Sequence, residues 1–490
     1  MGTPQHTTQS CETGPRKFFW NGSVMRWIWM TLLVASAGCA TYHPQPLDPG
    51  KSLDDWDGRS LNSPELRAFL ATNGVAMPEA GEPWNLKQLT LAALDFQPAL
   101  AEARTQLLSA QAAQITACER PNPSVTVTPG YDSQIPGSPS PWLVPLSFDL
   151  PLETAGKRWK RMAEARAQAE AARWTLAGAV WQVRSQVRAA LANLHAQLLI
   201  TSILEDEATE QNRLVQLLED QFKAGSLSGY ELTQARINAA NTLLAKLDAQ
   251  AKATQARLDL ARTLGLPSKA LLNVRLDFKE LDAAPGYLNK SDIRRETLLN
   301  RSDIRAALAS YAATEAALQL EIANQYPDIH LGPGYAWNNG SAGDNEWSLG
   351  LTLSLPVFNH NEGPVAQAEA NRQAAAAHFL TVQANAEADL DSALAGWHAA
   401  QQQIQAAHAM LEQSRKLLDS ARAQARSGES APATVAEAAV GFAAARQADI
   451  NAVIQGQQAL GQLEDVIQYP LAPAPAGIQP KPHTDHPLSP

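Results

Sequence analysis

The sequence predicts a mainly α-helical fold with a small membrane β-barrel, built from a duplicated helix–strand–strand–helix unit. Three observations predict this fold. Residues 156–223 and 363–426 lack proline after the first turn and carry apolar residues at helical spacing. Short segments between the helical stretches alternate strictly between apolar and polar residues. The same motifs then return in the same order in the second half of the chain.

The internal repeat sets the organisation of the chain. PNPSVTVTPGY begins at residue 121, and QYPDIHLGPGY begins at residue 325. Gly225 later recurs as Gly428 in a second pair of similar segments. Because self-similarity at a fixed offset is the signature of a repeated structural unit, we expect two repeats, at 88–265 and 291–467, joined by a linker at 266–290. Four residues of the first motif recur at one offset of 204, namely Pro123, Pro129, Gly130 and Tyr131 as Pro327, Pro333, Gly334 and Tyr335.

Each repeat is expected to contain the same elements in the same order. A helix comes first, at about 88–118 and 291–323. Two strands that flank a polar, turn-rich loop follow this helix, at about 122–131 and 142–151 in the first repeat and at about 327–338 and 346–356 in the second. A long helix, a glycine-containing turn and a medium-length helix then end the repeat.

The expected strands resemble those of a membrane barrel. Apolar residues occupy every second position, and the positions between them are mostly small or polar. This pattern suits a sheet with lipid on one side and water on the other, which would place Asp149 in the barrel lumen. A water-soluble antiparallel sheet with one wet face is the alternative. The apolar positions are Trp142, Val144, Leu146, Phe148 and Leu150 in one strand and Trp347, Leu349, Leu351, Leu353 and Leu355 in another.

The two long helices would each extend roughly 100 Å at 1.5 Å per residue. The apolar residues Leu176, Val187 and Leu198 follow one another at intervals of eleven. An eleven-residue repeat keeps a stripe on one face of a nearly straight helix, whereas an ordinary coiled coil repeats every seven residues. The sequence therefore favours an array of nearly straight helices.

The N-terminus reads as a processing signal. Residues 25–39, MRWIWMTLLVASAGC, place a basic residue before a short apolar run that ends in small residues and Cys39. We expect 1–38 to be a signal peptide, with Met25 a possible true start, and Cys39 to be the lipid-modified first residue of the mature protein. Residues 39–87 then form an N-terminal extension, and the Pro-rich stretch 468–490 is expected to be a disordered tail.

Composition and motifs exclude several function classes. The net charge of −10 gives no electrostatic attraction to nucleic acid. The sequence contains no P-loop, GxSxG, HExxH or CxxC motif, and its ten histidines are dispersed. We therefore predict that the protein is not an enzyme and that it carries no cofactor and no metal site.

The signal, the duplicated unit, and the PNP…PGY and LPLETAGKR segments together resemble the TolC-like outer membrane factors, over about residues 84–467. LPLETAGKR, which begins at residue 150, is most similar to the CzcC-like heavy-metal branch. The resemblance implies a homotrimer whose protomers share a 12-stranded β-barrel in the outer membrane. It also implies an α-barrel tunnel across the periplasm that meets a periplasmic adaptor and an inner-membrane RND-type pump. The implied function is tripartite efflux, with heavy-metal cations as the favoured cargo.

The resemblance also implies where partners would bind. The far ends of the helices are the two glycine turns, at 223–230 and 426–434. Glu231 and Glu437 follow these turns and could form a charged ring at the tunnel entrance, or they could be ordinary acidic residues at helix N-termini. The residues expected to contact the adaptor are Gly225, Ser226, Leu227, Gly428, Glu429 and Ser430.

Two other functions fit the same elements. A type I protein-secretion duct would use the same architecture with a different partner. A periplasmic coiled-coil scaffold would transport nothing. The sequence leaves the cargo open among metal, drug and protein, because no histidine or methionine cluster points to a metal.

Overall fold

The computed structural model describes residues 42–79, 81–131, 142–282, 294–295, 299–338 and 345–471. These described residues divide between Gly58 and Arg59 into two compact units. Within the first unit, α2 (Pro49–Asp57) is capped by Asp48, whose carboxylate accepts the backbone N–H of Gly50 at 2.9 Å. Cys39, the expected signal peptide and most of the expected tail lie outside the described residues.

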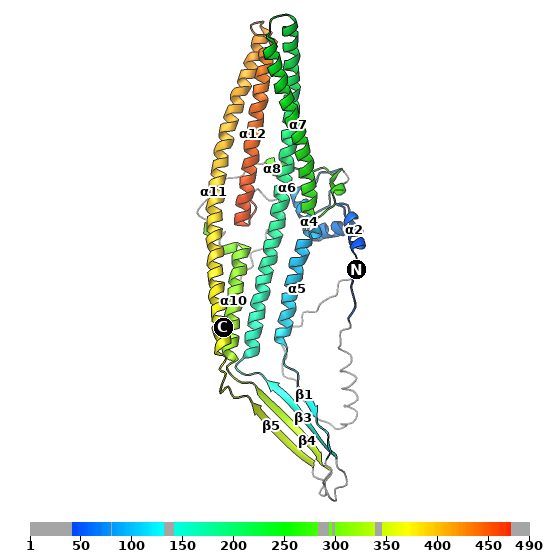
Figure 1. The fold of residues 1–490 in the computed structure, drawn as a ribbon, viewed down its shortest axis with the longest axis vertical. Coiled ribbons are helices and arrows are strands. Elements are labelled where there is room, and N and C mark those ends of the chain that lie inside the picture. Colours follow the sequence, from blue (N-terminus) through cyan, green and yellow to red (C-terminus); the bar gives the residue numbers. More distant parts are fainter. Residues whose placement is uncertain are drawn as a thin grey trace. The chain divides into compact units, whose positions relative to one another are not determined.

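Two antiparallel helical hairpins dominate the second unit (Figure 1). The first hairpin joins α6 (Lys157–Lys223) to α7 (Gly229–Leu264), and the second joins α11 (Glu362–Arg426) to α12 (Pro432–Ile467). Both second helices have 36 residues and begin 203 positions apart, so the two hairpins are equivalent. Helix α12 packs against α6 as well as against α11, and this contact joins the two repeats.

The helix expected at 88–118 is divided in two. Helix α4 (Leu86–Phe96) ends at Gln97, and α5 (Pro98–Cys118) begins at the next residue. Pro98 cannot donate a backbone hydrogen bond and disfavours helical geometry at the residue before it, so Gln97 is extended, with φ −71° and ψ 119°. The expectation of one helix was wrong here. In the second repeat, α10 (Ser302–Ala323) packs against both α6 and α11.

The strands form one antiparallel sheet in the order β1–β3–β4–β5. The expected first strand is divided into β1 (Ser124–Val127) and β2 (Gly130–Tyr131), and both pair with β3 (Trp142–Leu152). Strand β4 (Ile329–Asn338) pairs with β3 and with β5 (Asn345–Leu353), so the two repeats also meet within the sheet.

Segments expected to be an extension and a linker contribute to a hydrophobic core. Helix α3 (Pro64–Thr72), the short helix Ser268–Leu271 and α8 (Lys279–Asp282) pack with α4 against the middle of α6 and the C-terminal end of α7. The Trp84 N–H donates to the Arg275 carbonyl at 2.9 Å, and the Asp277 N–H donates to the Trp84 carbonyl at 2.9 Å. The chain before the first repeat and the chain after it are therefore hydrogen-bonded to each other.

Four charged residues connect the repeats where the middle of α6 meets the C-terminal end of α12, and we call them the inter-repeat cluster: Arg184 and Arg188 of α6, and Glu464 and Asp465 of α12. The Glu464 carboxylate is 1 % exposed and lies 3.2 Å from Nε of Arg188 and 3.3 Å from Nη1 of Arg184. A buried carboxylate is stable only when it is paired and hydrogen-bonded, so this cluster fixes how α12 sits on α6.

By length and composition, one stretch of α6 is apolar enough to cross a membrane, and 39 % of that stretch is buried within the monomer. Helix α6 also packs against α4, α5, α7, α10 and α12 of the same chain.

Candidate functional site

The turn between α6 and α7 closes the first hairpin with a left-handed glycine. Gly225 has φ 75°, its N–H donates to the Phe222 carbonyl at 3.0 Å, and the Ser226 N–H donates to the Gln221 carbonyl at 3.0 Å. This pair of bonds is the Schellman ending, which satisfies the last carbonyls of a helix and requires φ > 0 at one position. The Ser226 hydroxyl also donates to the Gln221 carbonyl, at 2.9 Å.

The turn between α11 and α12 repeats this geometry. Gly428 has φ 80°, its N–H donates to the Ala425 carbonyl at 3.3 Å, and the Glu429 N–H donates to the Gln424 carbonyl at 2.9 Å. The two turns therefore present the same backbone shape at the same end of both hairpins (Figure 1). Gly225, Ser226, Gly428 and Glu429 are exposed, whereas Leu227 and Ser430 are half-buried.

Leu227 differs from the other residues expected to contact an adaptor, because it packs inside the chain. It lies against the cluster that joins the two hairpin ends, formed by Leu214, Leu218, Leu232, Ala235, Ala433 and Ala436. Two large side chains at the same end are more exposed, Phe222 at 46 % and Tyr230 at 78 %. Neither was predicted from the sequence, although an aromatic residue beside a glycine turn at a helix end could have indicated both.

Glu231 and Glu437 have different surroundings. The Glu231 carboxylate accepts from the Ser228 hydroxyl at 2.8 Å and from the Ser228 N–H at 3.1 Å, which forms a capping box at the start of α7. These hydrogen bonds lower the pKa of Glu231. Glu437 lies on the groove between α11 and α12, beside Ser420 and Gln424. The structure therefore ties Glu231 to helix capping and leaves Glu437 facing solvent.

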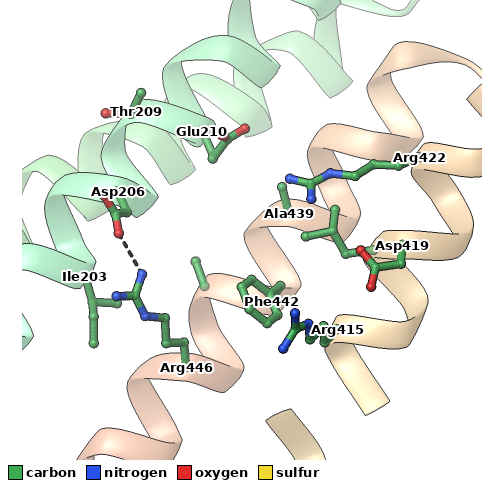
Figure 2. A pocket seen from close by; sticks show the side chains of 12 residues that line it. Ile203, Asp206, Thr209, Glu210, Arg415, Asp419, Arg422, Ala439, Phe442 and Arg446 are labelled. Carbon is green, nitrogen blue, oxygen red and sulfur yellow. Dashed lines mark hydrogen bonds and ion pairs between the residues drawn. The ribbon is translucent and has the colours of Figure 1, made fainter. Parts of the chain in front are cut away.

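A groove of about 460 Å³ lies between α6, α11 and α12, a few turns from the hairpin ends (Figure 2). Arg446 spans it with an ion pair to Asp206, with Nη1 and Oδ2 2.7 Å apart. The Phe442 ring also lines the groove, beside Arg415 (Figure 2). Charges of both signs line the groove, namely Asp206, Glu210 and Asp419 with Arg415, Arg422 and Arg446, so it suits a polar partner rather than an apolar one.

The sheet has one polar face and one apolar face. Asp149 and His330 lie on the polar face, with the His330 Nδ1 3.0 Å from one carboxylate oxygen. In the register of β3, β4 and β5, Ser147 lies opposite Gly334, Gly334 lies opposite Ser348, and His330 lies opposite Thr352. Asp149 therefore points to the face expected to line the lumen. His330 was not selected from the sequence, because its position beside Asp149 depends on the register between the two repeats.

Large apolar side chains cover the opposite face and are exposed in the monomer. Trp347 is 80 % exposed and Leu349 is 77 % exposed. Near one end of the sheet each repeat has a Tyr–Trp pair, with ring centroids 5.2 Å apart for Tyr131 and Trp142 and 4.7 Å apart for Tyr335 and Trp347. An apolar band bordered by Tyr and Trp is typical of a surface that meets lipid and its interface.

Among the described residues, no group of three or more His, Cys, Asp or Glu side chains is arranged to hold a metal ion. The structure instead brings together two geometries: a pair of equivalent turns at one end, and a two-faced sheet at the other.

Comparison with known proteins identifies relatives of both repeats. A family model described as outer membrane efflux protein matches residues 90–266 and 293–467. The cobalt-zinc-cadmium resistance protein CzcC of Cupriavidus metallidurans is 26 % identical over 216 residues, which are 44 % of this chain and 50 % of that protein. The match thus spans half the length of that relative.

Solved structures share the fold. The outer-membrane channel OprN superposes with a TM-score of 0.66 at 23 % identity, covering 78 % of this chain and 89 % of that one. The outer membrane protein VceC from Vibrio cholerae superposes with a TM-score of 0.64 at 20 % identity, covering 79 % of this chain and 96 % of that one. At these identities the likeness establishes the fold class, mainly helical with a small sheet.

Proposed function

Because the chain belongs to the outer membrane efflux protein family, whose members are outer-membrane channels, we propose that it is the channel subunit of a tripartite efflux system. In this proposal three copies share one barrel, and their helices form a tunnel that receives cargo from an adaptor and an RND-type pump. The observation that carries the proposal is the two-faced sheet at one end of long helices, whose two edge strands lack an outer partner among the described residues.

The sheet supports assembly on physical grounds. Within the part of the chain that the structure describes, β1 and β5 each have a partner on one side only. An unpaired strand edge cannot face hydrocarbon, since each unsatisfied backbone group costs several kcal/mol there. A single-chain barrel needs at least about eight strands. Strands from several copies must therefore close the barrel, and three copies would supply the expected twelve.

The hairpin ends are the proposed adaptor contacts. Gly225, Ser226, Gly428 and Glu429 present identical, exposed backbone turns, which suits a partner that repeats the same contact around a ring. Leu227 and Ser430 would support these turns rather than touch the adaptor. We propose Glu437, which faces a groove, as the better candidate for an acidic ring at the entrance, and Glu231 as a capping residue.

Heavy-metal cations are the proposed cargo. The similarity to a cobalt-zinc-cadmium resistance protein supports this assignment. The Asp149–His330 pair on the polar face of the sheet adds a carboxylate to each protomer's share of the lumen, and carboxylate rings favour cations in pores. The lipid anchor on Cys39 completes the proposal. Replacement of Cys39 by Ser should remove the acyl mass from the mature N-terminal peptide while leaving the barrel assembled.

Growth of a strain that lacks the gene tests the cargo. We expect sensitivity to cobalt, zinc and cadmium salts, restored by the intact gene, and unchanged resistance to lipophilic drugs. Sensitivity to drugs alone, or loss of a secreted protein, would reject metal export.

Conductance of the purified protein in planar bilayers tests the channel itself. Asp149→Asn should lower the preference for cations over anions, read as a shift in reversal potential under a salt gradient. Ser147→Ala lies on the same face and changes no charge, so it should leave the reversal potential unchanged. Absence of any conductance from assembled protein would reject the channel.

A further inference from the structure

The two repeats meet through a junction that the duplication should reproduce a second time. Within the chain, the long helix α6 of the first repeat packs against α10 and α12 of the second repeat. By equivalence of the repeats, the long helix α11 should pack against α5 and α7. Among the described residues, α11 makes no comparable packing with either helix, and its helix partners are α10 and α12.

Helix α7 has an exposed apolar face where its equivalent α12 is covered. Ile237, Leu243, Leu244, Leu247 and Leu258 are all more than 40 % exposed, which is unusual for five apolar residues of one helix in a folded protein. The positions 203 residues later on α12 are all half-buried, namely Val440, Arg446, Gln447, Ile450 and Gly461. The same face of the hairpin is thus covered in the second repeat and uncovered in the first.

The long helices show the matching difference. Leu214 of α6 is 9 % exposed, because it packs in the cluster that contains Ala433 and Ala436 of α12. Its equivalent on α11, Leu417, is 65 % exposed. The position equivalent to Ala433 on α7 is Tyr230, which is 78 % exposed. Leu417 of α11 and Tyr230 of α7 are therefore both exposed, although the equivalent positions pack together where α6 meets α12.

The uncovered faces of α11 and α7 carry charges of opposite sign. On each helix the sign is the reverse of the sign at the equivalent positions of α6 and α12, which are in contact. On the long helices, Arg184 and Arg188 of α6 correspond to Glu387 and Asp391 of α11. On the shorter helices, Asp465 of α12 corresponds to Arg262 of α7. The remaining member of the inter-repeat cluster, Glu464, corresponds to the neutral Ala261. Three of the four positions change sign together, which preserves attraction across the junction.

These groups are available within the monomer. The Arg262 side chain is 81 % exposed and pairs with Asp259 of its own helix, with Nη2 and Oδ1 3.2 Å apart. Asp391 is exposed. Glu387 is 39 % exposed, and its carboxylate lies 3.4 Å from Nη2 of Arg294. None of these pairs is buried, so each can rearrange when a second copy approaches.

We propose that α11 of one copy packs against α5 and α7 of the next copy, with Arg262 held by Glu387 and Asp391 of its neighbour. The inference rests on the proposed assembly of several copies into one channel, and it names the residues that set their order. Because the contact is head-to-tail, it does not give a two-fold dimer, and it gives a ring when the rotation from copy to copy closes. The sheet fits the same head-to-tail order, since β1 of the first repeat lies at one edge and β5 of the second repeat lies at the other.

A charge exchange tests the proposed contact in full-length, detergent-purified protein. Arg262→Glu and Asp391→Arg should each lower the temperature at which the assembled oligomer dissociates on native gels. The double variant should recover part of the loss, because it restores an opposite-charge pair between residues 262 and 391 while Glu387 keeps its charge. Lys252→Glu is the matched control: Lys252 is exposed and pairs with Asp248 on the same helix, and its equivalent Gln455 is exposed on α12.

Two results would overturn the inference. The first is an Arg262→Glu oligomer that dissociates at the same temperature as Lys252→Glu. The second is a double variant whose oligomer dissociates at a temperature no higher than the summed losses of the two single variants predict. Channel conductance is measured separately, so a protein that conducts normally with these results would refute the contact and leave the proposed function standing.

Cross-linking gives a second readout that does not depend on stability. With Cys118 replaced by serine, Arg262→Cys combined with Asp391→Cys should yield covalent dimers and larger species with a short bismaleimide. Lys252→Cys combined with Asp391→Cys should yield monomer. Cross-linked species in the control pair alone would place a different face of α7 at the junction.

Discussion

Gly461 of α12 lies against the guanidinium of Arg188 on α6, where a Cβ atom would come within 3.0 Å of Nη1. Arg188 uses this space to donate to the Gln457 carbonyl at 3.2 Å and to reach Glu464 at 3.2 Å. Burial lowers the pKa of Arg188, and the nearby charge of Glu464 opposes that shift. The missing side chain at 461 thus allows a buried cation to connect the two repeats.

Gly461→Ala should therefore destabilise the protein, although alanine favours helices. The methyl group would displace the guanidinium and leave Glu464 with fewer partners, and an unsatisfied buried polar group costs about 1–3 kcal/mol. Thermal unfolding followed by circular dichroism checks this. Gly441→Ala on the same helix is the control, since a Cβ there meets nothing within 4 Å, and it should be neutral or slightly stabilising. Equal melting temperatures for the two variants would contradict the role of the space.

Much of this fold follows from local sequence pattern. The long helices begin and end within one residue of the expected positions, because they lack interior proline and end at glycine turns with φ > 0. The strand alternation correctly separates the two faces of the sheet. The break at Gln97 was missed although Pro98 indicated it, because proline disrupts a helix interior and is favoured at the first position of a new helix.

Long-range features were not predictable in the same way. Residues 59–87 and 266–282 contain no strong periodicity, and they become part of a core only where the Trp84 backbone pairs with the chain after α7. At the candidate site, His330 beside Asp149 and the packing of Leu227 depend on register and on contacts between repeats. The capping role of Glu231 was visible in the sequence as Ser228 followed three residues later by Glu231, which matches the capping box.

Asp328 should make stability depend on acid pH. Burial alone would raise its pKa, but Lys157, with Nζ 2.8 Å away, and the Thr154 N–H at 3.0 Å outweigh burial and hold the pKa below the ordinary 3.8. A lowered folded pKa stabilises the protein above 3.8, and this contribution is lost as the pH falls through the folded value. Asp328→Asn should lower the melting temperature at neutral pH, with the difference from wild type shrinking below pH 3.8.

Asp465 should behave in the opposite sense. Burial is the largest effect and, with the charge of Glu464, raises its pKa above 3.8, although a hydrogen bond from Ser185 opposes this. Stability from a raised pKa is present below 3.8 and lost as the pH rises through the folded value. The melting temperature of Asp465→Asn should therefore rise relative to that of the wild type as the pH rises from 3.8 to neutral. The same pH trend in both aspartate variants would show that a common acid transition, not these contacts, controls stability.

Gly225 and Gly428 should resist replacement because of backbone conformation, not crowding. A Cβ at either position meets nothing within 4 Å, but φ is 75° and 80°. A left-handed conformation costs a side-chain-bearing residue about 1–2 kcal/mol. Either change to alanine should increase hydrogen exchange in the adjoining helix ends, and the double change should do so in both hairpins. Gly229→Ala is the control, because Gly229 is helical and its Cβ would lie an ordinary 3.6 Å from the Phe222 ring.

Leu349 and Ser348 are neighbours on β5 that point to opposite faces of the sheet, and they test which face meets lipid. Leu349 lies opposite Pro333 on the apolar face and is 77 % exposed in the monomer, whereas Ser348 lies opposite Gly334 on the polar face. An arginine facing lipid at mid-membrane costs about 2–4 kcal/mol, and a lumen position tolerates charge. Leu349→Arg should reduce the amount of assembled, heat-resistant oligomer in outer-membrane fractions, while Ser348→Arg should assemble normally and change ion selectivity. If both variants assemble to the same extent, the sheet has water on both faces and the barrel assignment is wrong.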